Sequence, residues 1–179
     1  MSTAIRFTYE DYLQLPEDRR YEIVDGDLFM VPAPTPYHQR VSRKLGRFLD
    51  DHVSERKLGE IFYAPCDLLL TEFDVVQPDI FYVSTERLSI IKEKNIQGAP
   101  DLVVEILSKG TEQRDRGIKQ KLYLRVGVKE YWIVDPDRRT IEVMTLGPEG
   151  YVPAGAYREQ HTLQSPLLPG LTIPLARIF

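Results

Sequence analysis

Cysteine is nearly absent from this sequence of 179 residues, since Cys66 is the only one. A single thiol excludes a disulfide framework and any zinc site built from several cysteines, and it fits a reducing cytoplasm. No stretch approaches the roughly 20 apolar residues of a membrane helix. The N-terminal segment also lacks the apolar run of a secretion signal. We therefore expect a cytoplasmic protein with no membrane partner.

Several motifs of common chemistries are also missing. The sequence has no Gly-rich phosphate loop, no nucleophile elbow and no zinc-ligand spacing. Its net charge of −4 argues against broad, nonspecific affinity for nucleic acid. Disorder is excluded by a composition of 42% hydrophobic and 28% charged residues, which is that of a globular protein. The length predicts one domain, residues 1–179, with a sizeable core.

Hydrophobic spacing predicts two main helices. Residues 38–57 form a long amphipathic helix, and its apolar face holds Val41, Leu45, Phe48, Leu49 and Val53. Residues 111–127 form the second helix, which ends at Gly127. Its inward face holds Ile118, Leu122 and Val126. A short helix within residues 7–17 is indicated by Thr8 as N-cap, with Asp11 in the position of a capping box.

The remaining segments are predicted to be strands. Residues 20–31 form a hairpin that turns at Asp25 and Gly26. The other strands lie in 60–71 (one long or broken strand), 77–84, 100–108 and 129–136, and a β extension follows at the C-terminus. The central order of helix, three strands, helix and strand predicts an α/β fold, with a mixed sheet flanked by helices.

Carboxylates interrupt this apolar framework. Glu105 lies in the middle of the aliphatic strand "DLVVEIL", where an unpaired charge costs several kcal/mol. Two strands begin with Pro-Asp, at Asp79 and at Asp101. Asp101 and Glu105 are roughly 13 Å apart along one strand, so they cannot share an ion. If the two Pro-Asp strands are antiparallel neighbours, Asp79 lies near Glu105 and Asp101 lies at the far edge.

Two carboxylates on adjacent strands repel unless a cation lies between them. Oxygen ligands of this kind suit Mg²⁺ or Mn²⁺, and carboxylate-held Mg²⁺ is common in phosphodiester hydrolysis. The following helix carries Asp115, Lys119 and Tyr123 at i, i+4 and i+8 on one stripe. This stripe either completes a site with the carboxylates or is a solvated helix face with a simple Asp–Lys pair.

Nearly the whole chain resembles the Uma-type family of endonucleases, which belongs to the restriction-endonuclease-like, PD-(D/E)XK, superfamily. The most specific part of the resemblance runs from Pro100 to Pro136. The motifs that carry it are "YEIVDGDL", "PTPYH", "QPDIFYVS", "GAPDLVVEILS", "RDRGIKQKLYLRVGVKEYWIVDP" and "LPGLTIPLARIF". The resemblance implies a core of helix, three strands, helix and strand, in which the strands form an antiparallel meander.

The resemblance also implies site residues. Asp79 matches the first aspartate of the superfamily pattern and Glu105 its second acidic metal ligand. The pattern has lysine two positions further on, where this chain has Leu107. Lys119 fits the family's Asp-x-x-x-Lys-x-x-x-Tyr spacing as a displaced catalytic lysine, with Lys121 as the alternative. Glu22 matches an acidic position of the family and is either a further metal ligand and catalytic residue or an exposed strand residue.

These residues lead us to expect an endonuclease that binds Mg²⁺ or Mn²⁺ and hydrolyses phosphodiester bonds in DNA. The basic helix face would contact the nucleic-acid backbone, and it holds Arg40, Arg43, Lys44 and Arg47. His38 either contacts phosphate or caps the helix. A homodimer suits the cutting of two strands. The alternatives are a homodimeric binding or assembly module without catalysis, which Leu107 and the acidic net charge favour, and a hydrolase of another phosphate ester.

Overall fold

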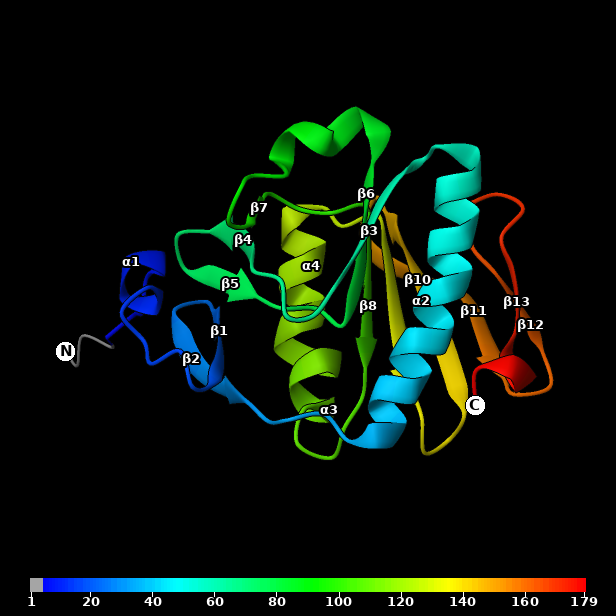
Figure 1. Ribbon diagram of the computed structural model, residues 1–179, viewed down its shortest axis with the longest axis horizontal. Helices are drawn as coiled ribbons and strands as arrows, with labels where there is room; N and C mark the ends of the chain where they lie inside the picture. Colours follow the sequence, from blue (N-terminus) through cyan, green and yellow to red (C-terminus); the bar gives the residue numbers. More distant parts are fainter. Residues whose placement is uncertain (1–4) are drawn as a thin grey trace.

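A six-stranded sheet forms the centre of the molecule (Figure 1). The computed structural model describes residues 5–179. Residues 1–4, the first part of the N-terminal segment in which we expect no secretion signal, lie outside the described residues. The strand order is β11-β10-β9-β8-β6-β3. The strands are β3 (Gly59–Tyr63), β6 (Ile80–Ser84), β8 (Leu102–Ile106), β9 (Glu130–Asp135), β10 (Thr140–Gly147) and β11 (Gly150–Arg158). β3, β6 and β8 are an antiparallel meander, and β9 is parallel to β8.

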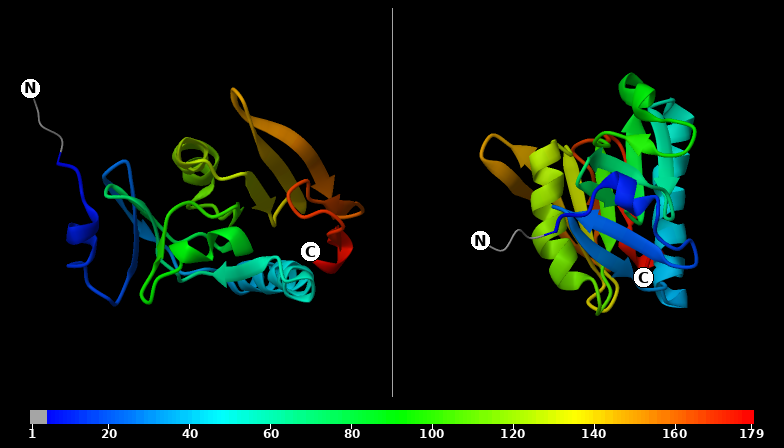
Figure 2. Two further views of the ribbon diagram at one scale, coloured as in Figure 1. Left: turned by 90° about the horizontal axis from the view of Figure 1, so that it is seen from above. Right: turned by 90° about the vertical axis from the view of Figure 1, so that its left-hand side faces the viewer.

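Helices cover both faces of this sheet, as Figure 2 shows. α2 (Pro36–Arg56) packs on one face together with the C-terminal strands β12 (Thr162–Gln164) and β13 (Thr172–Pro174). The crossover from β8 to β9 lies on the other face. It consists of α3 (Glu112–Arg114), a π-helical segment (Asp115–Lys119) and α4 (Gln120–Val126). Because strand residues alternate between faces, β8 contributes Val104 to the α2 side and Val103 to the α4 side.

A second sheet of five strands lies beside α4, in the order β2-β1-β5-β4-β7 (Figure 1). Its strands are β1 (Arg20–Val24), β2 (Asp27–Val31), β4 (Leu68–Thr71), β5 (Asp74–Val76) and β7 (Ile96–Gln97). The β1–β2 hairpin turns at Asp25 and Gly26, whose φ angles of 53° and 83° are those of the expected tight turn. This sheet brings the N-terminal hairpin against the crossover helix, the continuous helical segment from Glu112 to Val126.

Most expected elements are confirmed. α1 (Tyr9–Tyr12) has the Thr8–Asp11 capping box, and α4 ends at Gly127 with a φ of 83°. Residues 60–71 are broken between β3 and β4, which belong to different sheets. The inward position expected for Ile118 is wrong, because its side chain lies at the π-helical turn and is 36% exposed.

Capping of the long helix by His38 is also wrong. α2 begins two residues earlier at Pro36, and Thr35 is the N-cap, accepting a hydrogen bond from the His38 backbone N–H. Proline at the first helical position suits this start, because the N–H it lacks has no partner within the helix there. Among residues 5–179, no helix is long and apolar enough to cross a membrane.

Candidate active site

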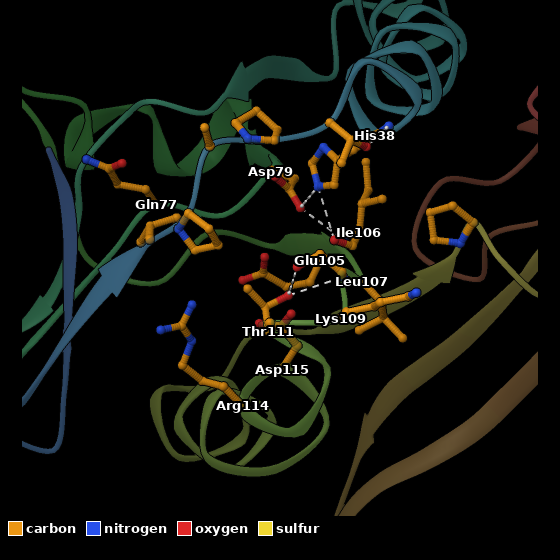
Figure 3. Close-up of a pocket in the computed structure, with 18 of the residues that line it drawn as sticks. His38, Gln77, Asp79, Glu105, Ile106, Leu107, Lys109, Thr111, Arg114 and Asp115 are labelled. Atoms are coloured by element: carbon orange, nitrogen blue, oxygen red, sulfur yellow. Dashed lines mark hydrogen bonds and ion pairs between the residues drawn. The ribbon is translucent and has the colours of Figure 1, made fainter.

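A hollow of about 520 Å³ opens where β8 ends, between the hairpin, the start of α2 and the crossover helix (Figure 3). Its polar lining comes from distant parts of the sequence. The acidic, basic and histidine side chains are those of Arg20, Glu22, His38, Asp79, Glu105, Lys109, Arg114, Asp115, Lys119 and Asp137. Since most of these side chains belong to different elements, the hollow depends on the fold rather than on one local motif.

Asp79 and Glu105 line this hollow together, as the antiparallel arrangement predicts. The pairing of Ile80 with Val104 continues outward and brings Asp79 beside Glu105. The backbone N–H of Ile106 donates to Asp79 Oδ2 at 2.8 Å, which fixes the aspartate next to the end of β8.

Asp101 lies at the other end of β8 and makes a separate set of contacts. Its Oδ2 accepts a 2.8 Å hydrogen bond from the Ser84 backbone N–H, and its Oδ1 lies 2.7 Å from Lys129 Nζ. The expected separation of Asp101 from the other two carboxylates is confirmed. Asp101 therefore joins the β6 end to the start of β9.

Lys119 lies among three carboxylates. Its Nζ is 2.8 Å from Glu22 Oε1, 2.9 Å from Glu105 Oε1 and 3.6 Å from Asp115 Oδ1. The residue is 3% exposed, so these charges interact in a poorly solvated environment. Lys121 is exposed on the same helix. Of the two lysines considered from the sequence, Lys119 is the one that reaches Glu105.

Glu22 is buried, with 1% exposure, so the alternative of an exposed strand residue is wrong. Besides Lys119, its Oε1 accepts a 2.9 Å hydrogen bond from the Gln77 backbone N–H. Its Oε2 lies 3.7 Å from Arg114 Nη2 and has no hydrogen-bond partner among the described residues. Glu22 thus links the hairpin to the crossover helix through two cations.

Tyr123 and His38 hold the two acidic groups in place. The Tyr123 hydroxyl donates to Glu105 Oε1 at 2.6 Å, so this oxygen accepts from both Lys119 and Tyr123. His38 Nε2 lies 3.2 Å from Asp79 Oδ2 and 3.1 Å from the Ile106 carbonyl oxygen. His38 lies in the hollow beside Asp79, which leaves its phosphate contact as a prediction.

The pKa values of the site reflect burial and the charges of neighbouring groups. Burial, together with the charges of Asp115, Asp79 and Glu22, raises the pKa of Glu105 to about 8, although Lys119 opposes this. Burial also raises the pKa of Asp115. For Glu22 the burial effect is outweighed by Lys119, so its pKa is lowered. Burial would lower the pKa of Lys119, but Glu105, Glu22 and Asp115 raise it, so the ammonium stays charged.

The His38 pKa is raised as well. Burial alone would lower it, but the hydrogen bond and the charge of Asp79 outweigh that effect. The contact with Asp79 therefore favours the protonated form of the imidazole, which lies beside Asp79 in the hollow (Figure 3).

The donor set fits a hard divalent cation with a partly open coordination sphere. Among residues 5–179, no three acidic, His or Cys side chains are arranged to hold an ion by themselves. Mg²⁺ usually takes one or two carboxylates and keeps several waters, and Asp79 and Glu105 offer that number. A divalent ion would also favour the ionised form of Glu105, whose pKa is now raised by burial and by the neighbouring carboxylates. Glu22 as a third metal ligand stays a prediction, and its present contacts are with Lys119, Gln77 and Arg114.

The basic face of α2 is divided by the fold. Arg43 and Arg47 line a second hollow beside the first, whereas Lys44 donates to the Ile178 carbonyl oxygen at 3.1 Å. Arg40 is exposed and lines neither hollow.

The sequence analysis did not identify Gln77 and Arg114 as partners of Glu22. The only indication in the sequence is that they are close in the chain to candidate residues, since Gln77 precedes Pro78-Asp79 and Arg114 precedes Asp115.

Comparison with known proteins identifies the family and the fold of this chain. The family model Uma2, described as "Putative restriction endonuclease", matches residues 9–176. A crystal structure titled as a "putative nuclease belonging to DUF820" from Anabaena variabilis has a TM-score of 0.80. It is 20% identical, and the alignment covers 97% of each chain, so the two share a fold. No curated protein matches the sequence. Because the family model covers nearly all of the chain, this protein belongs to the Uma2 family, as its motifs predicted.

Proposed function

We propose that this protein is a Mg²⁺-dependent endonuclease that hydrolyses phosphodiester bonds in DNA. The nuclease description of its family supports the reaction class. The observation that carries the proposal is the convergence of Asp79, Glu105 and Lys119 in one hollow, although they come from three separate elements. In this proposal Lys119 of the crossover helix replaces the lysine that the superfamily pattern has at position 107, and it is supported by the 2.9 Å distance from its Nζ to Glu105 Oε1.

Each residue has a role that follows from its contacts. Asp79 and Glu105 would hold Mg²⁺, which supplies Lewis acidity at the scissile phosphate. Lys119 stays protonated, so it acts as a hydrogen-bond donor to the attacking water or to the phosphate rather than as a base. Glu22 and Asp115 orient the Lys119 ammonium. His38 holds Asp79 in place through the 3.2 Å contact between its Nε2 and Asp79 Oδ2.

A cleavage assay tests this function. Supercoiled plasmid is incubated with the protein in Mg²⁺, Mn²⁺ or EDTA, and nicked and linear products are measured. We expect cleavage in either metal, no cleavage in EDTA, and losses of 100-fold or more for Asp79→Asn and Glu105→Gln. Glu60→Gln is the matched control, because Glu60 is an exposed carboxylate on β3.

The alternative of a binding module predicts a different result. Such a protein would retain DNA but leave the plasmid intact in every metal, and that outcome would refute hydrolysis. The homodimer also stays a prediction; light scattering of the purified chain at micromolar concentration tests it, since a dimer doubles the 20.7 kDa mass.

A further inference from the structure

A second hollow, of about 390 Å³, lies directly beside the candidate active site. The two hollows share Arg20, Pro34 and Asp79 in their linings. The remaining lining comes from α2 and from the end of β3, and consists of Gln39, Ser42, Arg43, Arg47, Asp50, Tyr63 and Ala64. Since Asp79 lines both hollows, the second hollow adjoins the place where the proposed function puts the scissile phosphate.

Two of the three guanidinium groups in the second hollow, those of Arg20 and Arg43, have no carboxylate partner among the described residues. The Arg43 side chain makes no ion pair or hydrogen bond with residues 5–179, and the Arg20 guanidinium donates to the Gln77 side-chain oxygen at 2.7 Å. The Arg47 Nε lies 3.6 Å from Asp51, but both side chains are largely exposed, and such pairs contribute little. Arginines of this kind are suited to phosphate, which they bind through two parallel hydrogen bonds.

An aromatic ring stands among these arginines. Tyr63 is 40% exposed and lies on Gly46 of α2, where an added Cβ would collide with the Tyr63 ring. The absence of a side chain at position 46 therefore lets the ring lie against the helix. Exposed aromatic rings beside arginines are the usual platform for stacked bases in proteins that bind single strands.

We propose that the second hollow holds one unpaired nucleotide of DNA, the one adjoining the phosphodiester bond at Asp79. Its phosphate would bind Arg43 and Arg20, and its base would stack on Tyr63. A base inside a duplex has both faces covered by its neighbours, so only an unpaired or extruded base reaches such a ring. This proposal rests on the proposed function, and it selects substrates with an unpaired nucleotide at the cleavage site.

Binding without cleavage tests the hollow by itself. Three labelled DNAs of equal length are titrated with the full chain in EDTA, and fluorescence anisotropy is measured. The DNAs are a paired duplex, the same duplex with one unpaired nucleotide, and a single strand. We expect the second and third to bind about tenfold tighter than the first, which is within the range of one base stacked on an aromatic ring.

Variants separate stacking from charge. Tyr63→Ala should abolish the preference and Tyr63→Phe should keep it. Gly46→Ala should weaken the preference because it displaces the ring, and it serves if Tyr63→Ala does not fold. Arg43→Ala should weaken binding to all three DNAs and reduce the salt slope by roughly 0.7–0.9, the value of one phosphate contact. Arg56→Ala, on the same helix but outside the hollow, should change neither.

The outcomes distinguish this proposal from the proposed function. Equal binding of the three DNAs, or a preference that survives both Tyr63→Ala and Gly46→Ala, overturns the nucleotide hollow. Preferential binding without any cleavage in Mg²⁺ keeps the hollow and refutes the hydrolase. Where cleavage occurs, the ratio of kcat/KM for bulged and paired DNA should fall about tenfold in Tyr63→Ala; an unchanged ratio contradicts the hollow and keeps the hydrolase.

Discussion

The substitution Glu105→Gln tests the charge balance of the site without requiring any activity. Burial and the neighbouring acids raise the pKa of Glu105 from 4.5 to about 8. In the metal-free protein at pH 7, the folded state therefore holds a proton that the unfolded state has released. Holding the proton against a pKa difference of this kind costs about 3 kcal/mol of folding free energy at pH 7.

The sign of the pH dependence follows from proton counting. Between pH 4.5 and pH 8 the folded state binds more protons at Glu105 than the unfolded state, so the contribution of this residue to stability falls as the pH rises. Below pH 4.5 both states are protonated and the cost disappears. Above pH 8 both are ionised and the cost stays constant.

Glutamine removes this cost and keeps the shape of the protonated side chain. Its Oε1 still accepts hydrogen bonds from Lys119 and Tyr123. In EDTA, we expect Glu105→Gln to exceed the parent protein in unfolding free energy by about 3 kcal/mol at pH 7. The difference should be near zero at pH 4.5 and should grow by about 1.4 kcal/mol per pH unit up to pH 8.

Urea unfolding at pH 5, 6, 7 and 8 measures this difference. Glu60→Gln provides the baseline, because Glu60 is exposed and its substitution should show no comparable trend. A Glu105→Gln difference that stays flat across this range would refute the electrostatic account of the site. With saturating Mg²⁺ the parent should regain stability that the variant cannot, so the gap between the two proteins should narrow.

Three further predictions concern the same fold. Lys119→Met should lower the unfolding free energy by about 3–5 kcal/mol at pH 8, because it leaves buried carboxylates without their cation. Lys121→Met is the control in the same urea titration and should change the unfolding free energy little, because Lys121 is exposed. Mg²⁺ at 100 times its Kd should raise the unfolding free energy of the parent by about 2.7 kcal/mol but not that of Asp79→Asn; equal gains would place the ion elsewhere. Gly59→Ala should destabilise more than Gly127→Ala by thermal melting: both glycines have positive φ, but only at Gly59 would a Cβ meet backbone.

Much of the fold follows from local patterns. The buried positions of α2, including Val41, Leu45 and Leu49, match the helical spacing of the sequence. The Asp25–Gly26 hairpin and the Thr8 cap depend on a few adjacent residues and form where expected. The neighbourhood of Asp79 and Glu105 followed from one assumption, the antiparallel pairing of two strands, and that pairing is observed.

Contacts between distant segments were harder to predict. Glu22 is buried because the hairpin packs against the crossover helix, and nothing local to "RYEIV" indicates that it lies against Lys119. Gln77 holds Glu22 through its backbone N–H, which carries no side-chain signature. Arg114 reaches the same carboxylate from another element. These residues act through tertiary packing, and a single sequence does not record it.

The π-helical segment (Asp115–Lys119) explains why Ile118 is exposed and why both Lys119 and Tyr123 reach Glu105. In a pure α-helix, a stripe at i, i+4 and i+8 drifts steadily around the axis, because four residues exceed the 3.6-residue turn. A π-turn contains more residues than an α-turn, so the step from Asp115 to Lys119 falls short of a full turn, while the step from Lys119 to Tyr123 exceeds one. The two offsets oppose each other, and all three side chains face the Glu105 side of the helix, where Lys119 and Tyr123 bond Glu105 directly. The same wide turn rotates Ile118 toward solvent. The exposure of Ile118 therefore accompanies the placement of Lys119 against Glu105. The strand of Glu105 itself has Leu107 where the superfamily pattern has lysine.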